Sequence, residues 1–211
     1  MEIACLDLEG VLVPEIWIAF ANRTGIKALE RTTRDEPDYD LLMQYRLNIL
    51  RENNLTLGAI KEVIEELDPL DGAKEFLHWL KVRFQVVILS DTFYEFAHPL
   101  MKKLDYPALL CHELEVDQND FLIGCRLRQS RPKRQAVVAL KSIYYKTIAA
   151  GDSYNDIEML READTGILFR APQNVIEEFP EFPAVESYDS LKKQFLNATN
   201  RDLLIQHGKT Y

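Results

Sequence analysis

Polar side chains follow apolar runs at three places in the sequence. Asp7 and Glu9 come after IACL, Ser90 and Asp91 after FQVVIL, and Asp152 after KTIAAG. An apolar run that closes on polar residues is typical of a buried strand leading into a loop. Each such residue alone is a common turn or cap residue. If the runs are parallel strands, however, their polar ends meet at one edge of the sheet, where ligands bind.

The chemistry of these side chains suits phosphoryl transfer. Asp7 and Asp152 are the kind of carboxylate pair that holds Mg²⁺, which keeps its other positions for water and substrate phosphate. A carboxylate in such a site can also attack phosphorus and form an aspartyl phosphate. That step needs a fixed cation and hydrogen-bond donors around the transferred group. Lys133, in RPKRQ, is a candidate for the cation, and Ser90 for the hydroxyl donor.

The apolar runs require a sheet that is covered on both faces. Continuous apolar strands of this kind belong to parallel sheets, and a fourth run, ADTGILF, lies at 163–169. Helical patterns separate the runs, at 73–84, 93–104, 132–145 and 153–163. The alternation of strand and helix predicts an α/β fold with a doubly wound parallel sheet.

Two segments interrupt the alternation. Residues 14–70 are too long for a simple crossover and predict three helices, at 15–25, 38–53 and 56–67, with Thr56 as an N-cap. Residues 108–128 alternate apolar and polar side chains around DQND, which predicts a β-hairpin.

The domain organisation follows from these segments. We predict an α/β core made of residues 1–13 and 71–205, and a helical cap domain at 14–70 that is inserted after the first strand. The last residues, 201–211, show no strong periodicity.

Composition excludes several classes of function. The chain has 211 residues and a formal net charge of −9, which argues against nucleic acid as a partner. No apolar run reaches the length of about 18 residues that suggests a membrane span. The acidic N-terminus does not resemble a signal peptide. The three cysteines form no metal-binding pattern, so we expect reduced thiols and a cytoplasmic location. The four histidines show no ligand spacing, and surface or partly buried positions are expected for them.

Four short motifs resemble those of the haloacid dehalogenase superfamily. They are DLEGV at 7–11, LSDT at 89–92, Lys133, and GDSYND at 151–156, and they follow one another in the family's order over nearly the whole chain. The inserted helices are similar to the cap of the phosphoserine phosphatase branch. Members of that branch that also transfer the phosphoryl group to homoserine likewise carry glutamate at the second acidic position, here Glu9.

The resemblance implies roles for the acidic residues. Asp7 would be the nucleophile that becomes phosphorylated, with Mg²⁺ as the cofactor. Glu9 would be the general acid for the leaving alcohol and then the general base for the acceptor, with its backbone carbonyl on the metal. Asp152 would be the second carboxylate ligand, and Asp156 would orient the metal's waters.

The resemblance also implies which residues bind the substrate. Ser90 and Lys133 would hold the phosphoryl oxygens, with Asn155 near the phosphate. Asp91 stands where glycine is common in the branch, so contacts made there by backbone need to be examined.

Two residues of the predicted cap match the branch's contacts to the amino acid itself. Glu15 would meet the amino group of the substrate, and Arg46 its carboxylate, through a bidentate pair. The alternatives are that Glu15 is only an acid in the first turn of a helix and that Arg46 is a surface residue.

The resemblance therefore implies a Mg²⁺-dependent phosphatase that acts on O-phosphoserine through phospho-Asp7, with water or homoserine as acceptor. One alternative is a related phosphatase for another small phosphomonoester. A second is a receiver-like signalling domain, although receivers lack both an acid two residues after the phosphorylated one and a helical insertion of this size. Residue types do not decide between the two acceptors. We expect a monomer or a homodimer.

Overall fold

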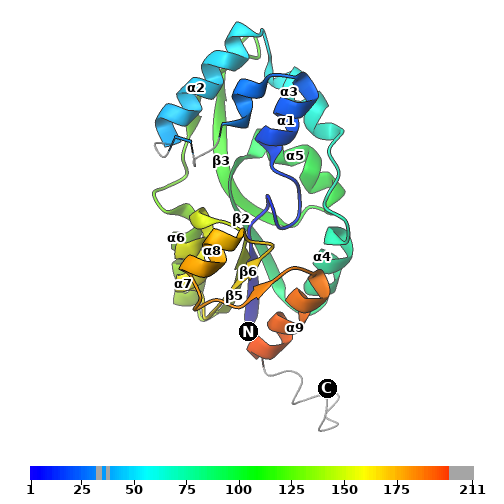
Figure 1. Ribbon diagram of the computed structural model, residues 1–211, viewed down its shortest axis with the longest axis vertical. Helices are drawn as coiled ribbons and strands as arrows, with labels where there is room; N and C mark the ends of the chain where they lie inside the picture. The colour runs from blue at the N-terminus through cyan, green and yellow to red at the C-terminus, as the bar shows by residue number, and fades with distance from the viewer. Residues whose placement is uncertain (32–34, 37–38, 200–211) are drawn as a thin grey trace.

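A sheet of seven strands lies at the centre of the residues that the computed structural model describes, 1–31, 35–36 and 39–199 (Figure 1). The strands are β1 (Glu2–Leu6), β2 (Gln85–Phe93), β3 (Ala108–Val116), β4 (Leu122–Arg126), β5 (Lys146–Gly151), β6 (Thr165–Phe169) and β7 (Ala184–Val185). Their order is β4-β3-β2-β1-β5-β6-β7, and every neighbouring pair is parallel except β3 and β4. The chain builds outward from β1 on one side and then from β5 on the other. The switch in strand order therefore lies between β1 and β5.

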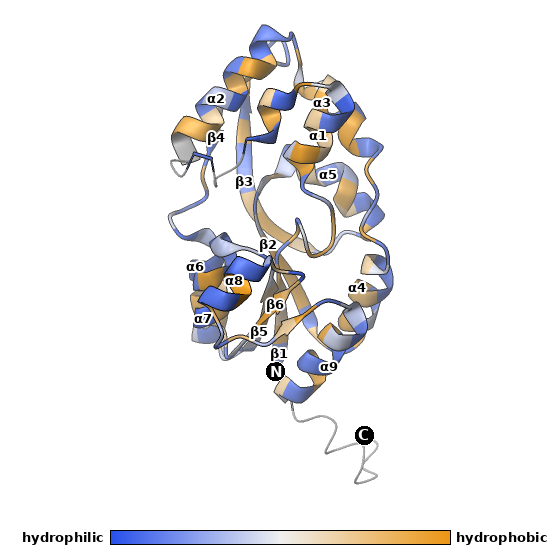
Figure 2. Ribbon diagram, in the orientation of Figure 1, coloured by the Kyte–Doolittle hydropathy of each residue, from blue (hydrophilic) through white to orange (hydrophobic). Residues whose placement is uncertain are grey.

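Helices cover both faces of the sheet. Helices α4 (Ala73–Lys81) and α9 (Tyr188–Thr199) lie over one face, and α6 (Pro132–Ser142), α7 (Ile157–Glu162) and α8 (Gln173–Glu178) over the other. Successive residues of a strand point to opposite faces, so Ala4 and Leu6 enter one apolar core whereas Ile3 and Cys5 enter the other. The central strands are accordingly mostly hydrophobic and the helices amphipathic (Figure 2). The predicted doubly wound α/β fold is confirmed.

The helices predicted between the first two strands are present. They are α1 (Ile16–Thr24), a 3₁₀ turn η1 (Lys27–Glu30), α2 (Tyr39–Glu52) and α3 (Leu57–Glu65). The Thr56 hydroxyl accepts a hydrogen bond from the backbone N–H of Ala59, as expected of an N-cap. These helices gather at one end of the molecule, beyond the sheet (Figure 1).

The predicted β-hairpin is also present, as β3 and β4. Because β3 pairs with β2 as well, the hairpin forms an edge of the main sheet and extends toward α2 (Figure 1). At its turn, the backbone carbonyl of Asp120 accepts from Leu57 N–H at 2.8 Å, and its carboxylate accepts from Gly58 N–H at 2.7 Å. The hairpin thus caps the N-terminus of α3 and ties it to the sheet.

Some predicted boundaries were wrong. Ser90 and Asp91 do not follow β2 but lie within it, because the backbone stays extended to Phe93. The pairing with β1 nevertheless stops at Ile88, and the register with β3 shifts between Leu89 and Phe93. Ser90 and Asp91 thus lie where the strand has left both ladders.

Helix α4 ends at Lys81 rather than at 84, and α7 is preceded by a 3₁₀ turn, η2 (Tyr154–Asp156). Helices α8 and α9 and strand β7 were not predicted, while helix α5 (Tyr94–Lys103) was, and it contains Pro99. Residues 201–211 lie outside the described residues. The three cysteines are free thiols. Over the described ranges, the helices are too short or too polar to cross a membrane.

Candidate active site

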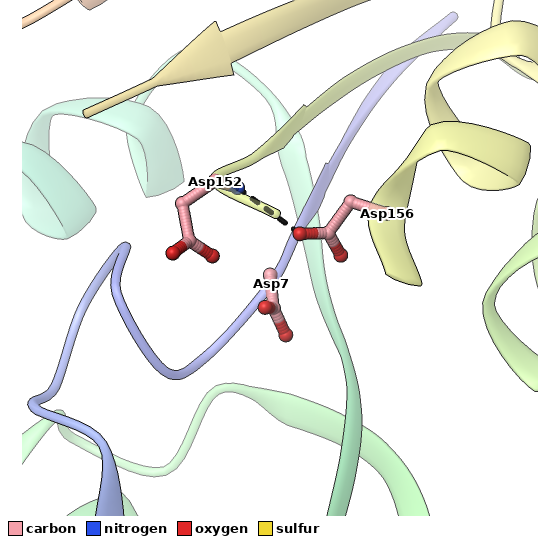
Figure 3. A group of neighbouring side chains, drawn as sticks. All are labelled: Asp7, Asp152 and Asp156. Carbon is pink, nitrogen blue, oxygen red and sulfur yellow. Dashed lines mark hydrogen bonds between the residues drawn. The ribbon is translucent and has the colours of Figure 1, made fainter. Parts of the chain in front are cut away.

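Three aspartates converge at the switch in strand order. Asp7 follows β1, Asp152 follows β5, and Asp156 ends the turn η2 (Figure 3). One carboxylate oxygen from each lies within 4.8 Å of those of the other two. The strand order therefore brings together Asp7 and Asp152, which lie far apart in the sequence.

Two glycines let these carboxylates approach the backbone so closely. Gly10 has a φ of +74°, and a Cβ placed there would lie 2.5 Å from Cγ of Asp152. A Cβ on Gly151 would overlap the carboxylate of Asp156. The role of these two glycines was not predicted from the sequence, although each comes within a few residues of a predicted strand end, where close approach of a backbone is a usual reason for glycine.

Lys133 is the cation at the centre of the site. Pro132 occupies the first turn of α6 and places the lysine there. The Lys133 ammonium lies 2.7 Å from Asp156, 3.0 Å from Asp7 and 3.3 Å from Asp91, and the residue is only 3% exposed. Burial alone would lower its pKa, but the three carboxylates raise it well above its usual value. Lys133 therefore stays charged.

One lysine does not balance the charge of the carboxylates around it. Burial, and then the charge of Asp156, raise the pKa of Asp7 well above its usual value. Burial, Asp156 and Glu15 raise the pKa of Asp152 to about 7. Like charges held this close in a buried site favour either proton uptake or a cation. The oxygen donors and their excess negative charge suit a hard divalent cation such as Mg²⁺.

Glu9 connects the site to the helices of 14–70. Its carboxylate accepts a hydrogen bond from the backbone N–H of Ile16, the first residue of α1, at 2.7 Å. Burial, followed by the charge of Glu15, raises the pKa of Glu9 to about 8, although Lys133 and Arg46 act in the opposite direction. Glu9 therefore holds its proton to a much higher pH than an ordinary glutamate does, which suits a group that exchanges protons near neutral pH.

Asp91 and Asn155 flank Lys133. The side-chain amide of Asn155 donates to Oδ2 of Asp91 at 2.8 Å. Burial would raise the pKa of Asp91, but Lys133, His112 and Asn155 together hold it well below its usual value. Ser90 is 2% exposed, and its hydroxyl accepts from Thr92 N–H at 3.2 Å. Asp91 thus holds Lys133 and Asn155 by its side chain.

The two predicted cap residues act on the site through their charge. Glu15 is exposed, immediately before α1, and raises the pKa of both Glu9 and Asp152. Arg46 is 6% exposed, so the alternative of a surface residue was wrong. Its guanidinium carbon lies 4.4 Å from the ring centre of Trp17, and Nη2 donates to the backbone carbonyl of Arg31 at 2.8 Å.

His112 is the site residue that the sequence analysis placed wrongly. A surface or partly buried position was expected, but His112 is 3% exposed on β3 and its Nε2 faces Asp91. A lone histidine in an alternating strand offers no signal, because its partner Asp91 comes from the neighbouring strand.

Comparisons with known proteins agree with this arrangement. The family model of haloacid dehalogenase-like hydrolases matches residues 7–161. The chain is 66% identical over 203 residues to phosphoserine phosphatase ThrH of Pseudomonas aeruginosa, covering 96% of this chain and 99% of the relative. It is 64% identical over 205 residues to a phosphoserine phosphatase of Pseudomonas syringae pv. tomato, covering 97% and 86%.

Solved structures share the fold at low sequence identity. A phospho-aspartyl intermediate analogue of phosphoserine phosphatase superposes with a TM-score of 0.73 at 20% identity, covering 88% of this chain and 93% of that one. A substrate-bound phosphoserine phosphatase complex also gives 0.73, at 18% identity, covering 91% and 96%. With a family model that spans most of the chain and relatives of high identity, the conclusion is direct: this chain belongs to the haloacid dehalogenase-like hydrolase family.

Proposed function

We propose that the chain is a Mg²⁺-dependent phosphatase that acts on O-phosphoserine through a phosphorylated Asp7. The observation that carries the proposal is the buried Asp7 carboxylate, held 3.0 Å from the Lys133 ammonium beside Asp152. The relatives of 66% and 64% identity, both named phosphoserine phosphatases, support the choice of substrate.

The first half-reaction transfers the phosphoryl group to Asp7. Leu8 N–H and Lys133 already hold Oδ1 of Asp7, so we assign the attack to Oδ2. The new O–P bond forms as the bond between phosphorus and the serine oxygen breaks, and Glu9 gives its proton to that oxygen. Serine leaves, and Lys133 offsets the negative charge on the phosphoryl oxygens.

The second half-reaction reverses the role of Glu9. As a carboxylate, Glu9 takes a proton from the acceptor hydroxyl while the acceptor oxygen attacks phosphorus and the bond to Asp7 breaks. The product is inorganic phosphate when the acceptor is water, and a phosphate ester when it is homoserine. Both halves use a single group, whose pKa of about 8 lies near neutrality.

The metal site uses the same carboxylates. Asp7, Asp152 and the backbone carbonyl of Glu9 would hold Mg²⁺, and Asp156 would orient its waters. Asp156 is suited to this supporting role because it already accepts from the backbone N–H groups of Asp152 and Ser153 and from Lys133. When bound, the cation supplies positive charge to the phosphoryl oxygens.

The serine portion of the substrate is expected to bind to residues of the helices between β1 and α4. We propose that residues 14–70 form a cap over a core made of 1–13 and 71–205, with Glu15 binding the amino group of the substrate and Arg46 its carboxylate. The burial of Arg46 and the electrostatic influence of both residues on Glu9 support this assignment.

We further propose that homoserine is a second acceptor. The support is Glu9 itself, because the members of the branch that carry out this transfer have glutamate at the same motif position. In the structure the longer side chain also reaches the N-terminus of α1. Three expectations stay predictions. They are the binding of a phosphoryl oxygen by Ser90, the cytoplasmic location, and the monomeric or homodimeric state.

Product analysis tests the proposal. With phosphoserine and Mg²⁺, ³¹P NMR should show inorganic phosphate, and added homoserine should give a second phosphate ester. Asp7→Asn should abolish both products, and activity that survives in this variant would contradict the covalent route.

Arg46→Ala tests the substrate. KM for phosphoserine should rise strongly, while hydrolysis of p-nitrophenyl phosphate, which has no carboxylate, should change little. Arg51→Ala, an exposed arginine on the same helix, is the matched control. Equal losses on both substrates would contradict the role of Arg46 in binding the substrate carboxylate.

A further inference from the structure

His112 lies at the point where β3 leaves the main sheet. It is paired with Phe93 at the end of β2, after which β3 continues only as the partner of β4. The imidazole is 3% exposed and lies beside the Phe93 ring, with 6.2 Å between ring centres. It is thus held on one side by packing and faces the active site on the other.

A hydrogen bond to Nδ1 defines where the ring proton of His112 lies. Nδ1 accepts from the backbone N–H of Arg128 at 3.1 Å, so this nitrogen carries a lone pair. The ring proton is then on Nε2, which lies 3.8 Å from Oδ1 of Asp91. This distance is longer than a hydrogen bond, so the Nε2–H group acts on Oδ1 by electrostatic attraction at short range.

Asp91 connects His112 to the groups proposed to react. Its other oxygen, Oδ2, lies 3.3 Å from the Lys133 ammonium and accepts from Asn155 at 2.8 Å. Lys133 in turn lies 3.0 Å from Asp7. A continuous set of contacts therefore leads from His112 through Asp91 to the cation beside Asp7.

We propose that His112 is a positioning residue for phosphoryl transfer, acting through Asp91. Its Nε2–H keeps Oδ1 of Asp91 turned away from Lys133, so that only Oδ2 contacts the Lys133 ammonium. Without this donor, the carboxylate can rotate and offer both oxygens to Lys133, which draws the ammonium away from Asp7 and the transferred phosphoryl group. The inference rests on the proposed function.

Substitution of His112 in two backgrounds tests the proposal. His112→Phe preserves ring volume but removes the donor, and it should lower kcat about tenfold with a smaller change in KM, as for side chains that orient a catalytic group. His112→Gln keeps an N–H donor and should recover most of the loss. In Asp91→Asn, His112→Phe should cause no further loss. The exposed histidine substitution His98→Phe is the control.

Two outcomes of these kinetics would overturn the proposal. One is an equal loss from His112→Phe with Asp91 present and with Asp91→Asn. The other is an equal loss in His112→Gln and His112→Phe, which would show that packing and not the donor matters.

A measurement without turnover separates this inference from the proposed function. Wild-type protein that is inactive on phosphoserine would refute the proposed substrate, but the ¹⁵N spectrum of the histidines still tests the contact. We expect His112 protonated on Nε2, with this resonance shifted by Asp91→Asn. Protonation on Nδ1, or no shift in the variant, would overturn the inference.

Discussion

Gly10→Ala tests whether a glycine positions the Asp152 carboxylate. The added Cβ would lie 2.5 Å from Cγ of Asp152, whereas carbon atoms in contact are normally about 3.5–4.0 Å apart. Asp152 must therefore move by about 1 Å, a misplacement that can cost about 100-fold in rate. The positive φ of +74° adds strain of about 1–2 kcal/mol for a residue with a side chain.

Gly25→Ala separates the two effects. Gly25 has nearly the same φ, +73°, but nothing lies within 4 Å of its added Cβ. Urea unfolding should show similar losses of stability in the two variants. Calorimetric titration with Mg²⁺ and the rate of phosphate release should show a loss only in Gly10→Ala. If Gly10→Ala keeps Mg²⁺ affinity and activity within twofold of wild type, the close packing does not position Asp152, and the reasoning is refuted.

Three further predictions concern the raised pKa values of Glu9 and Asp152, the proton that Glu9 donates, and the contact between Asp120 and the start of α3. Without metal, Glu9 and Asp152 in the folded chain keep their protons at pH values above their ordinary pKa values of 4.5 and 3.8, whereas in the unfolded chain they lose them there. The melting temperature should therefore fall as the pH rises from about 5 to 8. Added Mg²⁺ should then stabilise the protein more at about pH 8 than at about pH 5, and an equal gain in calorimetry would contradict this. Glu9→Gln should lower steady-state turnover of phosphoserine by about 100-fold or more. It should still release a burst of nitrophenol from p-nitrophenyl phosphate, because this leaving group needs no proton. Stopped-flow absorbance without a burst would refute the assignment of Glu9 as the general acid. Asp120→Ala should unfold about 1 kcal/mol more easily in urea than Asp120→Asn, because only asparagine keeps an oxygen for Gly58 N–H, while activity stays unchanged.

The meeting of the polar strand ends was predictable because the strands themselves are marked by residues that are close in sequence. Each apolar run closes on its own polar residues, and the carboxyl ends of parallel strands share an edge, so the meeting of Asp7 and Asp152 follows from the fold class alone. The helices at 16–65 were predictable for the same reason, since their periodicity is local.

The contacts between side chains were not predictable in this way. His112 and Asp91 come from different strands, and their distance depends on the register shift of β2 against β3, which leaves no trace in either segment. Lys133 was identified as a cation, but its sharing among three carboxylates depends on where α6 packs. Helix α9 did leave a signal, because its buried Tyr188, Leu191 and Phe195 have helical spacing.

Trapping of the phosphorylated enzyme tests the central claim most directly. The protein is mixed with phosphoserine and Mg²⁺, quenched in acid within the first turnover, digested, and mapped by mass spectrometry. We expect one phosphoryl group, on Asp7, that appears before free phosphate accumulates and is absent from Asp7→Asn. Phosphate release without any labelled Asp7, or a label on another residue, would contradict the covalent route.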